Sequence, residues 1–476
     1  MNARLPKVCI IGAGSSGIAA CKVFKEYGLP YDCFDASDRI GGNWVFKNSN
    51  GMSSAYRSLH INTSRDKMAY SDFPLPKDYP DFPNHFQIAE YFENYVDRFN
   101  FRSAITLNVA VSQLTQLEDS RWQVKLSHGE TRDYDAVVVA NGHHWDPQFP
   151  DPKFPGTFNG EEIHSHHYID VTDPIDFKDK NVVIVGMGNS AMDIACELGR
   201  QGVAKNCFLS VRRGTHIVPK YFGSEPLDNL LRHPAEKPSI FEHLLNKLPR
   251  AWVQAIVRPL FAHKVRSHVG NPEDYGLPKP KHKIGMTHPT VSDEIHIRLG
   301  SGDVKPKPNI KELMGDEVLF EDGSREPVDV IIYATGYKVT FPFLDASYID
   351  TKDNDVALYQ RIVDPKYPNL LFLALVQPLC AMMPIAEQQA IWMANYLTGH
   401  YHLPSTSSME QTLREEHEEI KAGYVNSKRH TIQIDCQNYT YHLAQDLKAG
   451  QERALVAGNS LPIPGKATQE TEAAVV

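Results

Sequence analysis

The chain has 476 residues, of which 42% are apolar and 22% charged, and its formal net charge at pH 7 is −9. A chain of this length predicts roughly two to four domains and a large core that needs neither disulfides nor metals. The acidic balance argues against nucleic acid as a partner, because a phosphate backbone binds basic surfaces. We therefore expect an ordinary soluble globular protein.

The seven cysteines are scattered, odd in number and form no C-x-x-C pair. This pattern predicts reduced thiols in a reducing compartment, with no dithiol redox pair and no thiolate zinc site. The opening residues MNARLPK leave no room for a signal peptide, and no apolar run reaches the roughly 18 residues of a transmembrane helix. We expect a cytoplasmic protein with a flexible C-terminal tail over 451–476.

Apolar runs and helical patterns alternate along the chain in two strand–helix–strand units. The first unit is predicted at 7–11, 18–27 and 31–35. The second is predicted at 181–185, about 190–200 and 206–211. A further apolar run, DVIIYATG, covers 329–336, and a segment rich in Pro, His and Lys precedes it at about 214–300. The repeated unit predicts an α/β fold with two Rossmann-like dinucleotide-binding domains.

The first glycine-rich loop directly follows a predicted strand and opens a predicted helix. Its residues are Gly12, Ala13, Gly14, Ser15, Ser16 and Gly17. The first glycine permits the tight turn, the second lets the backbone approach a pyrophosphate, and the third allows close helix–strand packing. Asp35, at the end of the second strand, offers a carboxylate to ribose hydroxyls and repels a 2′-phosphate. The loop therefore predicts a site for FAD or NAD rather than for NADP.

The second glycine-rich loop has the same context but a different strand end. Its residues are Gly186, Met187, Gly188, Asn189, Ser190 and Ala191. The strand that follows ends in Ser210, Val211, Arg212 and Arg213. A guanidinium group binds phosphate through two donors at once, so an arginine pair here suits a 2′-phosphate, although it could also be only a solvated strand end. One flavin site and one NADPH site together indicate an NADPH-dependent flavoenzyme.

Residues 158–168, FNGEEIHSHHY, contain three histidines and also a spaced pattern. Phe158, Gly160, His164 and Tyr168 fit F-x-G-x-x-x-H-x-x-x-[Y/F/W]. This resembles the fingerprint of the flavin-containing monooxygenases and of their Baeyer–Villiger relatives. Further stretches also resemble that family over roughly residues 5–440: GGNW (41–44), INTSRDKMAYSDFP (61–74), FLSVRRGT (208–215), KPKHKIGMTHPTVSDE (279–294), YATGY (333–337), QPLCAMMPIAEQQA (377–390) and YVNSKRHTIQID (424–435).

The resemblance implies how the chain is divided. We expect a discontinuous FAD-binding domain (1–170 and 329–450). An NADPH-binding domain (171–328) is expected between its halves, with a helical lid inserted at about 214–300. The fingerprint would then be the joint between the two domains. We expect His164→Ala to impair reduction by NADPH more than FAD binding, and changes at His166 and His167 to be mild.

The resemblance also implies a reaction and site residues. NADPH reduces the flavin, O₂ adds to it, and the C4a-hydroperoxyflavin is held with NADP⁺ until an amine nitrogen or sulfide sulfur attacks. No catalytic triad is required. The motif match makes Asn62 the catalytic candidate, because a neutral amide can hydrogen-bond the adduct or NADP⁺ without adding charge. The residues implied in FAD contact are Ser16, Asp35, Gly42, Asn43, Trp44, Asn62 and Thr63.

Other reactions and roles remain open. Baeyer–Villiger oxidation of ketones is the first alternative, although that branch usually ends its fingerprint in Trp where this chain has Tyr168. A largely uncoupled NADPH oxidase that releases H₂O₂ is the second, and a non-catalytic nucleotide sensor is the third. A metal site at the three histidines is not expected, because no further ligands accompany them. We also expect a homodimer, on no particular sequence feature.

The segment 238–269 is basic and has apolar residues at helical spacing. We expect Pro249 and Pro259 to divide it into short helices. The preferred interpretation is a lid that packs its apolar face over the substrate channel. The alternative is a basic amphipathic helix in peripheral contact with a membrane surface.

Overall fold

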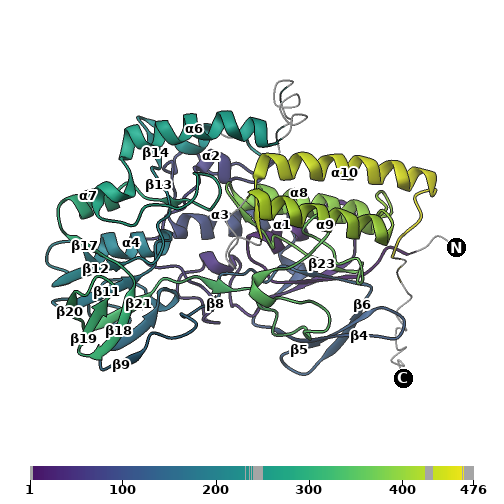
Figure 1. Ribbon diagram of the computed structural model, residues 1–476. Helices are drawn as coiled ribbons and strands as arrows, with labels where there is room; N and C mark the ends of the chain where they lie inside the picture. The colour runs from purple at the N-terminus through teal and green to yellow at the C-terminus, as the bar shows by residue number, and fades with distance from the viewer. Residues whose placement is uncertain are drawn as a thin grey trace.

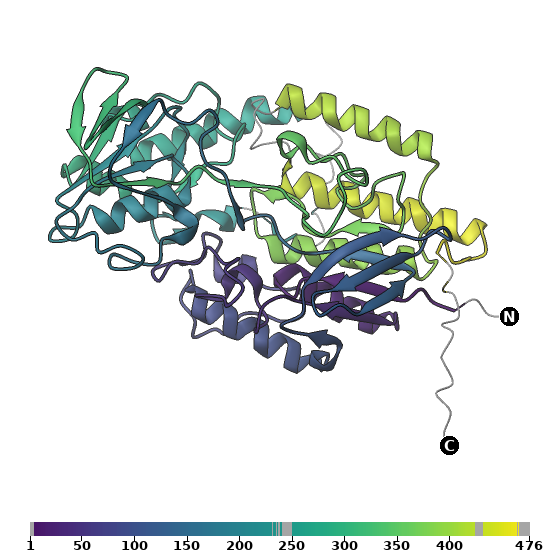
Figure 2. The ribbon, with the colours of Figure 1, turned by 90° about the horizontal axis from the view of Figure 1, so that it is seen from below.

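The computed structural model describes residues 4–230, 232–234, 236, 239, 250–423, 432–463 and 465. The chain forms two lobes, each built on a five-stranded parallel sheet. Its beginning and its end lie in the same lobe, and its middle forms the other (Figures 1 and 2). We call them the first and the second lobe.

The first lobe is a sheet between two unlike layers. Its strand order is β3-β2-β1-β7-β23, with β1 Val8–Ile11, β2 Tyr31–Phe34, β3 Ile105–Thr106, β7 Ala136–Val139 and β23 Leu370–Phe372. One face packs on the helices α1 Ser15–Glu26, α3 His85–Arg98 and α8 Met382–Leu397. The other face packs on the antiparallel strands β4 Val111–Gln116, β5 Trp122–Leu126 and β6 Thr131–Tyr134. Burial on both faces explains why β1 and β7 are uninterrupted apolar runs.

The second lobe repeats this construction. Its strand order is β10-β21-β11-β12-β17, with β10 Glu161–His164, β21 Val330–Tyr333, β11 Asn181–Val185, β12 Asn206–Ser210 and β17 Val304–Lys307. One face carries α4 Asn189–Leu198 and α7 Ile295–Gly300. The other carries β9 Gly156–Phe158, β18 Ile310–Gly315, β19 Glu317–Phe320 and β20 Arg325–Pro327. The predicted α/β fold with two Rossmann-like units is confirmed.

The structure places three strands differently from the expected boundaries. β9, which precedes residue 170, pairs with β18 of the second lobe. The division at 170 and 329 puts β10 and β21 in the first domain, yet both pair within the second sheet, β21 between β10 and β11. A short, fully buried run can join either sheet, and only its partner decides which one. The chain crosses between the lobes at β8 Asp146–Pro147 and β22 Tyr337–Lys338, which pair antiparallel.

The inserted segment at 214–300 contains more than a helical lid. It holds β13 Ile217–Val218, β14 Tyr221–Phe222, β15 Glu225–Pro226, η4 Leu227–Leu230, α6 Arg250–Val269, η5 Pro272–Tyr275, β16 Thr290–Val291 and α7. Pro249 lies outside the described residues. The expected break at Pro259 is wrong, because this residue lies inside α6. The helix continues past it even though proline contributes no backbone N–H.

The C-terminal part of the first lobe differs from expectation in two ways. The helix α10 Cys436–Val456 extends past residue 451, where a tail was expected to begin. Cys380 and Cys436 form a disulfide, so the prediction of reduced thiols throughout is wrong. The pairing of β24 Gln377–Pro378 with β25 Gln433–Ile434 brings the two cysteines together. The five free cysteines are all buried.

The remaining elements are short or peripheral. They are η1 Gly42–Trp44, α2 Arg65–Met68, η2 Arg102–Ala104, η3 Ser165–His167, η6 Lys352–Asn354 and α9 Thr406–Gly423. Within the described ranges, no helix combines the length and apolar character needed to cross a bilayer. Nor do three His, Cys, Asp or Glu side chains in those ranges gather as a metal site would require.

Candidate functional site

The glycines of the first loop meet two different demands. Gly12 has φ +104°, and a Cβ there would lie 2.6 Å from the Ala140 carbonyl oxygen. A Cβ at Gly17 would overlap the Gly12 carbonyl oxygen. A Cβ at Gly14, by contrast, would meet no protein atom closer than the Gly42 Cα at 3.6 Å. The protein's own packing therefore requires two of the glycines, whereas the third leaves room for a ligand's phosphates to approach.

Asp35 holds this loop to the end of β2. Its carboxylate is buried and accepts hydrogen bonds from the N–H groups of Ala13 at 2.5 Å and Ser37 at 2.7 Å. Burial raises the pKa of this carboxyl, and the two hydrogen bonds oppose that shift. Each oxygen keeps a second lone pair for a ribose hydroxyl. Since α1 begins at Ser15 and Ser16 without a side-chain cap, its first N–H groups are left to an anion.

The GGNW segment closes the other side of the loop. The N–H of Gly41 donates to the Ala13 carbonyl at 3.0 Å. The side-chain oxygen of Asn43 accepts from the N–H of Ser54 at 2.8 Å and from its hydroxyl at 3.0 Å. Trp44 is half-buried against the core of the first lobe. Residues far apart in the sequence thus surround one loop at the carboxyl end of β1.

The second loop is supported by the insertion. Gly186 has φ +138°, and a Cβ there would lie 2.5 Å from the Ala334 carbonyl oxygen. Gly188 is the N-cap of α4, and it too lacks a side-chain cap. The Thr290 hydroxyl donates to the Met187 carbonyl at 2.5 Å. The Asn189 side-chain oxygen is occupied by the N–H of Val291 at 2.9 Å, while Ser190 and Ala191 form the first turn of α4.

The polar residues at the strand end after the second loop are of two kinds: one is bonded within the protein and two are exposed. Ser210 is buried, and its hydroxyl donates to the Pro308 carbonyl at 3.0 Å, so it is engaged within the protein. Arg212 and Arg213 are exposed, and within the described residues neither forms an ion pair. The two guanidinium groups are therefore free for an anionic ligand, as the sequence suggests, whereas Ser210 is not.

Asn62 lies in a segment whose backbone is hydrogen-bonded by side chains of the insertion. Asn62 and Thr63 are half-buried, and the hydrogen bonds of the described residues include none from the Asn62 amide. The N–H of Ser64 donates to Asp228 at 2.6 Å. Lys220 donates to the Ile61 carbonyl at 3.3 Å. Burial lowers the pKa of this lysine.

Sequence reasoning did not single out Lys220 or Asp228. Both lie in the insertion, and neither belongs to a glycine-rich loop or to the fingerprint. The Lys220 ammonium lies within electrostatic reach of Asp193 and Asp293, which oppose the effect of its burial. A lone Lys or Asp in a segment without periodicity gives no signal of such contacts. Only the folded insertion reveals them.

The first two residues of the fingerprint have a packing explanation. A Cβ at Gly160 would overlap the Asp329 carbonyl oxygen and lie 2.5 Å from the Phe158 ring. Phe158 in turn packs on the core between the second sheet and β18–β19. The pair therefore sets how closely the start of β10 approaches β21.

His164 and Tyr168 contact different parts of the molecule. The buried His164 ring contacts Phe149 and Tyr337, with centroids 5.5 and 5.4 Å apart, so it lies against the β8–β22 crossing. Burial, and repulsion from His166 and from the next histidine, lower its pKa to about 4. The buried Tyr168 hydroxyl donates instead to Glu197 of α4 at 2.9 Å. The fingerprint thus does link the crossing to the second lobe.

The other two histidines differ from each other. His166 is buried and donates through Nε2 to the Gly51 carbonyl at 2.9 Å, while its own N–H donates to Nδ1 of His164 at 3.1 Å. His167 is exposed. The structure therefore groups His166 with His164, although the spaced pattern includes only His164.

Comparison with known proteins identifies the family. The model of the flavin-binding monooxygenase-like family matches residues 5–456. The chain belongs to this family. It is 37% identical over 445 residues to rat flavin-containing monooxygenase 5, covering 90% of this chain and 80% of that protein. It is 34% identical over 459 residues to the N-oxide-forming dimethylaniline monooxygenase 2 of Macaca mulatta, covering 93% and 83%.

Solved structures confirm the fold. The S-allyl-L-cysteine S-oxygenase of Allium sativum superposes with a TM-score of 0.67 at 24% identity, covering 94% of this chain and 90% of that one. Oxidized steroid monooxygenase bound to NADP gives a TM-score of 0.69 at 18% identity, with 94% and 98% covered. At the level of the family, the expected enzyme class and the cofactors FAD and NADPH are confirmed.

Proposed function

We propose that the chain is an NADPH- and O₂-dependent monooxygenase that oxygenates the nitrogen of amines or the sulfur of sulfides. The observation that carries this proposal is the difference between its two loops. A carboxylate, Asp35, lies beside the first loop. Arg212 and Arg213, which form no ion pair among the described residues, follow the strand after the second loop. The first environment suits the ribose of FAD and the second the 2′-phosphate of NADPH.

Each cofactor would be held by groups already in place. FAD would lie with its pyrophosphate against Gly14 and the start of α1, with Asp35 at its ribose and the GGNW segment beside it. NADPH would lie with its pyrophosphate at the start of α4. Bound flavin accepts a hydride and activates O₂, which is the cofactor's own chemistry. The chain's part is to orient the two cofactors and to exclude water from them.

Asn62 is the residue we propose to act at the reacting centre. Its amide is half-buried and is not engaged by other described side chains. A neutral amide donates and accepts hydrogen bonds without placing a charge beside the flavin. We propose that it orients the flavin and the nicotinamide, together with Thr63.

The preference for nitrogen and sulfur rests on Tyr168 and on the relatives. The Macaca mulatta relative is named as N-oxide-forming, and the Allium sativum protein as an S-oxygenase. Oxidation of ketones and uncoupled NADPH oxidation are the competing reactions. We expect NADPH consumption to be stimulated by tertiary amines and sulfides, with little H₂O₂ released. Coupled turnover with ketones alone, giving esters, would replace this proposal, and H₂O₂ equal to the NADPH consumed would favour the oxidase.

The surface of α6 favours a lipid contact over the preferred lid. Its inward side packs Phe261 and Val265 on Val218 and Ile284 of the insertion. Trp252, Ile256 and Leu260 are spaced one turn apart on α6 and are 67%, 68% and 68% exposed. This helix lies along the upper edge of the molecule in Figure 1. This apolar stripe is exposed on an outer edge, so in this structure it does not pack over a substrate channel as a lid would.

We propose that this stripe inserts into the headgroup region of an anionic membrane. The exposed Arg266 on the same helix would face the lipid phosphates, whereas the Lys264 ammonium lies over the Phe222 ring of the insertion. We expect co-sedimentation with phosphatidylserine vesicles at low salt, and its loss when Trp252, Ile256 and Leu260 are changed to Ser. The control is Leu455→Ser, which removes an exposed apolar side chain from α10. Absence of binding by the unaltered protein would restore the lid interpretation.

A further inference from the structure

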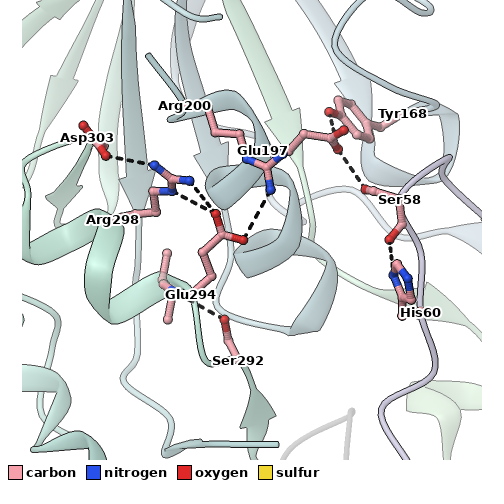
Figure 3. A network of polar contacts seen from close by, with 10 residues as sticks. Ser58, His60, Tyr168, Glu197, Arg200, Ser292, Glu294, Arg298 and Asp303 are labelled. Carbon is pink, nitrogen blue, oxygen red and sulfur yellow. Dashed lines mark hydrogen bonds and ion pairs between the residues drawn. The ribbon is translucent and has the colours of Figure 1, made fainter. Parts of the chain in front are cut away.

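Two carboxylates of the helix α4 accept hydrogen bonds from a part of the chain that precedes the second lobe. It begins at the second glycine loop, and Asp193 and Glu197 lie one turn apart along it. The hydroxyl of Tyr56 donates to Asp193. The hydroxyl of Ser58 donates to Glu197 at 3.1 Å, and that carboxylate also accepts from Tyr168 (Figure 3). Both contacts join α4 to a segment that precedes it by more than 130 residues.

The contacted segment is anchored in the second lobe by the buried Tyr56, whereas Arg57 and Ser58 are exposed. Tyr56 is packed in the same apolar core as Tyr168, with ring centroids 6.4 Å apart. The N–H of Arg57 donates to the Ile169 carbonyl at 2.8 Å, and its guanidinium group donates to Asp170 at 2.7 Å. Burial raises the pKa of the Asp193 carboxyl, while the bond from Tyr56 opposes the shift. The half-buried Asp193 carboxylate is therefore held by one specific donor, the Tyr56 hydroxyl.

The segment leads directly to Asn62, four residues after Ser58. Beyond Ser58, Lys220 holds the Ile61 carbonyl and Asp228 holds the N–H of Ser64. The residues from 56 to 64 thus belong to the first part of the chain, yet side chains of α4 and of the insertion hold them. The place of Asn62 depends on the second lobe as well as on the first.

We propose that Asp193 and Glu197 are positioning residues that tie the Asn62 segment to the helix at whose start NADPH binds. A single rigid helix would then set Asn62, the nicotinamide and the flavin relative to one another. This inference rests on the proposed role of Asn62. The contacts of the FAD loop with Asp35 and Gly41 lie elsewhere, so they are not affected when the tie is broken.

The test removes one hydroxyl or one charge at a time. Tyr56→Phe keeps the packed ring and removes the donor to Asp193, and Glu197→Gln removes the charge that holds Ser58 and Tyr168. The control is Glu294→Gln. Glu294 pairs with Arg200 and Arg298 in the same lobe (Figure 3), and among the described residues its ion pairs and hydrogen bonds do not include 56–64. All variants are compared as holoenzymes after their FAD content is measured from the flavin absorbance.

Anaerobic stopped-flow reduction by NADPH gives the decisive readout. We expect Tyr56→Phe and Glu197→Gln to bind FAD fully and to show an unchanged half-saturating NADPH concentration. Their limiting rate of flavin reduction should fall roughly 10- to 100-fold, because a misplacement of about 1 Å can cost about 100-fold. The H₂O₂ released per NADPH in air should rise, and Glu294→Gln should match the unaltered protein.

Two results would overturn the inference. Reduction rates and H₂O₂ yields equal to those of the control would show that the tie does nothing for the reaction. Loss of FAD in step with the loss of rate would show a merely structural role. Failure of the proposed function is a separate result, because flavin reduction is measured without O₂ or substrate. If no amine or sulfide were oxygenated, the reduction rates would still decide the inference.

Discussion

The two lobes are built alike, but they support their glycine loops differently. Both are parallel sheets with helices on one face and a small second sheet on the other, antiparallel in the first lobe and mixed in the second. The first loop is tied by Asp35 and Gly41, from the strand and turn that follow it closely in the chain. The second loop is tied by Thr290 and Val291, about a hundred residues away in the insertion. The two loops are alike, and we propose that the strand end beside each loop selects the dinucleotide.

The largest expected effect separates glycines needed for folding from one needed for a ligand. Gly17→Ala would force a Cβ onto the Gly12 carbonyl, so we expect destabilisation of about 3 kcal/mol or more and poor folding. Gly14→Ala meets no protein atom within 3.6 Å, so it should fold and yet lose most of its FAD. Gly300→Ala, with open space around it, is the control. Thermal unfolding and flavin absorbance measure both outcomes, and a yellow Gly14→Ala protein would contradict the assignment.

The next prediction tests the strand end of the second lobe. Arg212→Ala and Arg213→Ala each remove a charge-assisted contact, so the KM for NADPH should rise roughly 10- to 100-fold. The KM for NADH should not change, because NADH lacks the 2′-phosphate. Arg200→Ala is the matched control, since this exposed arginine pairs with Glu294. An equal rise for both nucleotides would move the assignment from the 2′-phosphate to the pyrophosphate.

A pH dependence follows from the buried ring at the joint between the lobes. The pKa of His164 is lowered to about 4, below the ordinary value of 6.5, so the unfolded chain takes up the proton first. The free energy of unfolding that the neutral His164 ring contributes is fully present above pH 6.5 and is lost as the pH falls toward 4. By pH 5 the loss is about 2 kcal/mol. Denaturant unfolding at pH 7.5 and 5 should therefore show a smaller loss of stability for His164→Phe than for the unaltered protein.

The smallest effects sharpen the interpretation of the three histidines. His166→Ala removes a buried bond to Gly51, so a cost of about 1 to 3 kcal/mol is expected in thermal unfolding. His167→Ala changes an exposed side chain and should cost within about 0.5 kcal/mol. For His166→Ala we therefore expect this larger loss of stability instead of the mild effect that the sequence suggests. Equal costs at both positions would show that burial does not separate them.

Much of the local structure was predictable from local pattern. Both strand–glycine–helix units were placed correctly, because a buried parallel strand is an uninterrupted apolar run and a glycine turn must follow it. The strand β10 was assigned to the wrong lobe, because its four residues do not reveal which sheet they join. The break predicted at Pro259 is wrong, because the helix accommodates a proline that contributes no backbone N–H.

The residues of the site also divide into those that local pattern predicts and those that depend on distant contacts. Gly14, Asp35 and the arginine pair are predicted from the sequence because their chemistry depends on residue type and short spacing, and their binding roles stay predictions. Lys220, Asp228, Asp193 and the disulfide between Cys380 and Cys436 were not, because each depends on a partner distant in the chain. Ser210 was included by its position, and its hydroxyl was found facing Pro308.

The sequence by itself determined that this protein has two Rossmann-like units and which family it belongs to, and it predicts which unit suits a 2′-phosphate. These properties lie in residue types at fixed short spacings, which act through local backbone geometry and charge. Only the tertiary structure decided where the lobes divide, which side chains hold the Asn62 segment, and which face of α6 is bare. Those properties depend on long-range packing, because a contact exists only when two distant segments reach the same place.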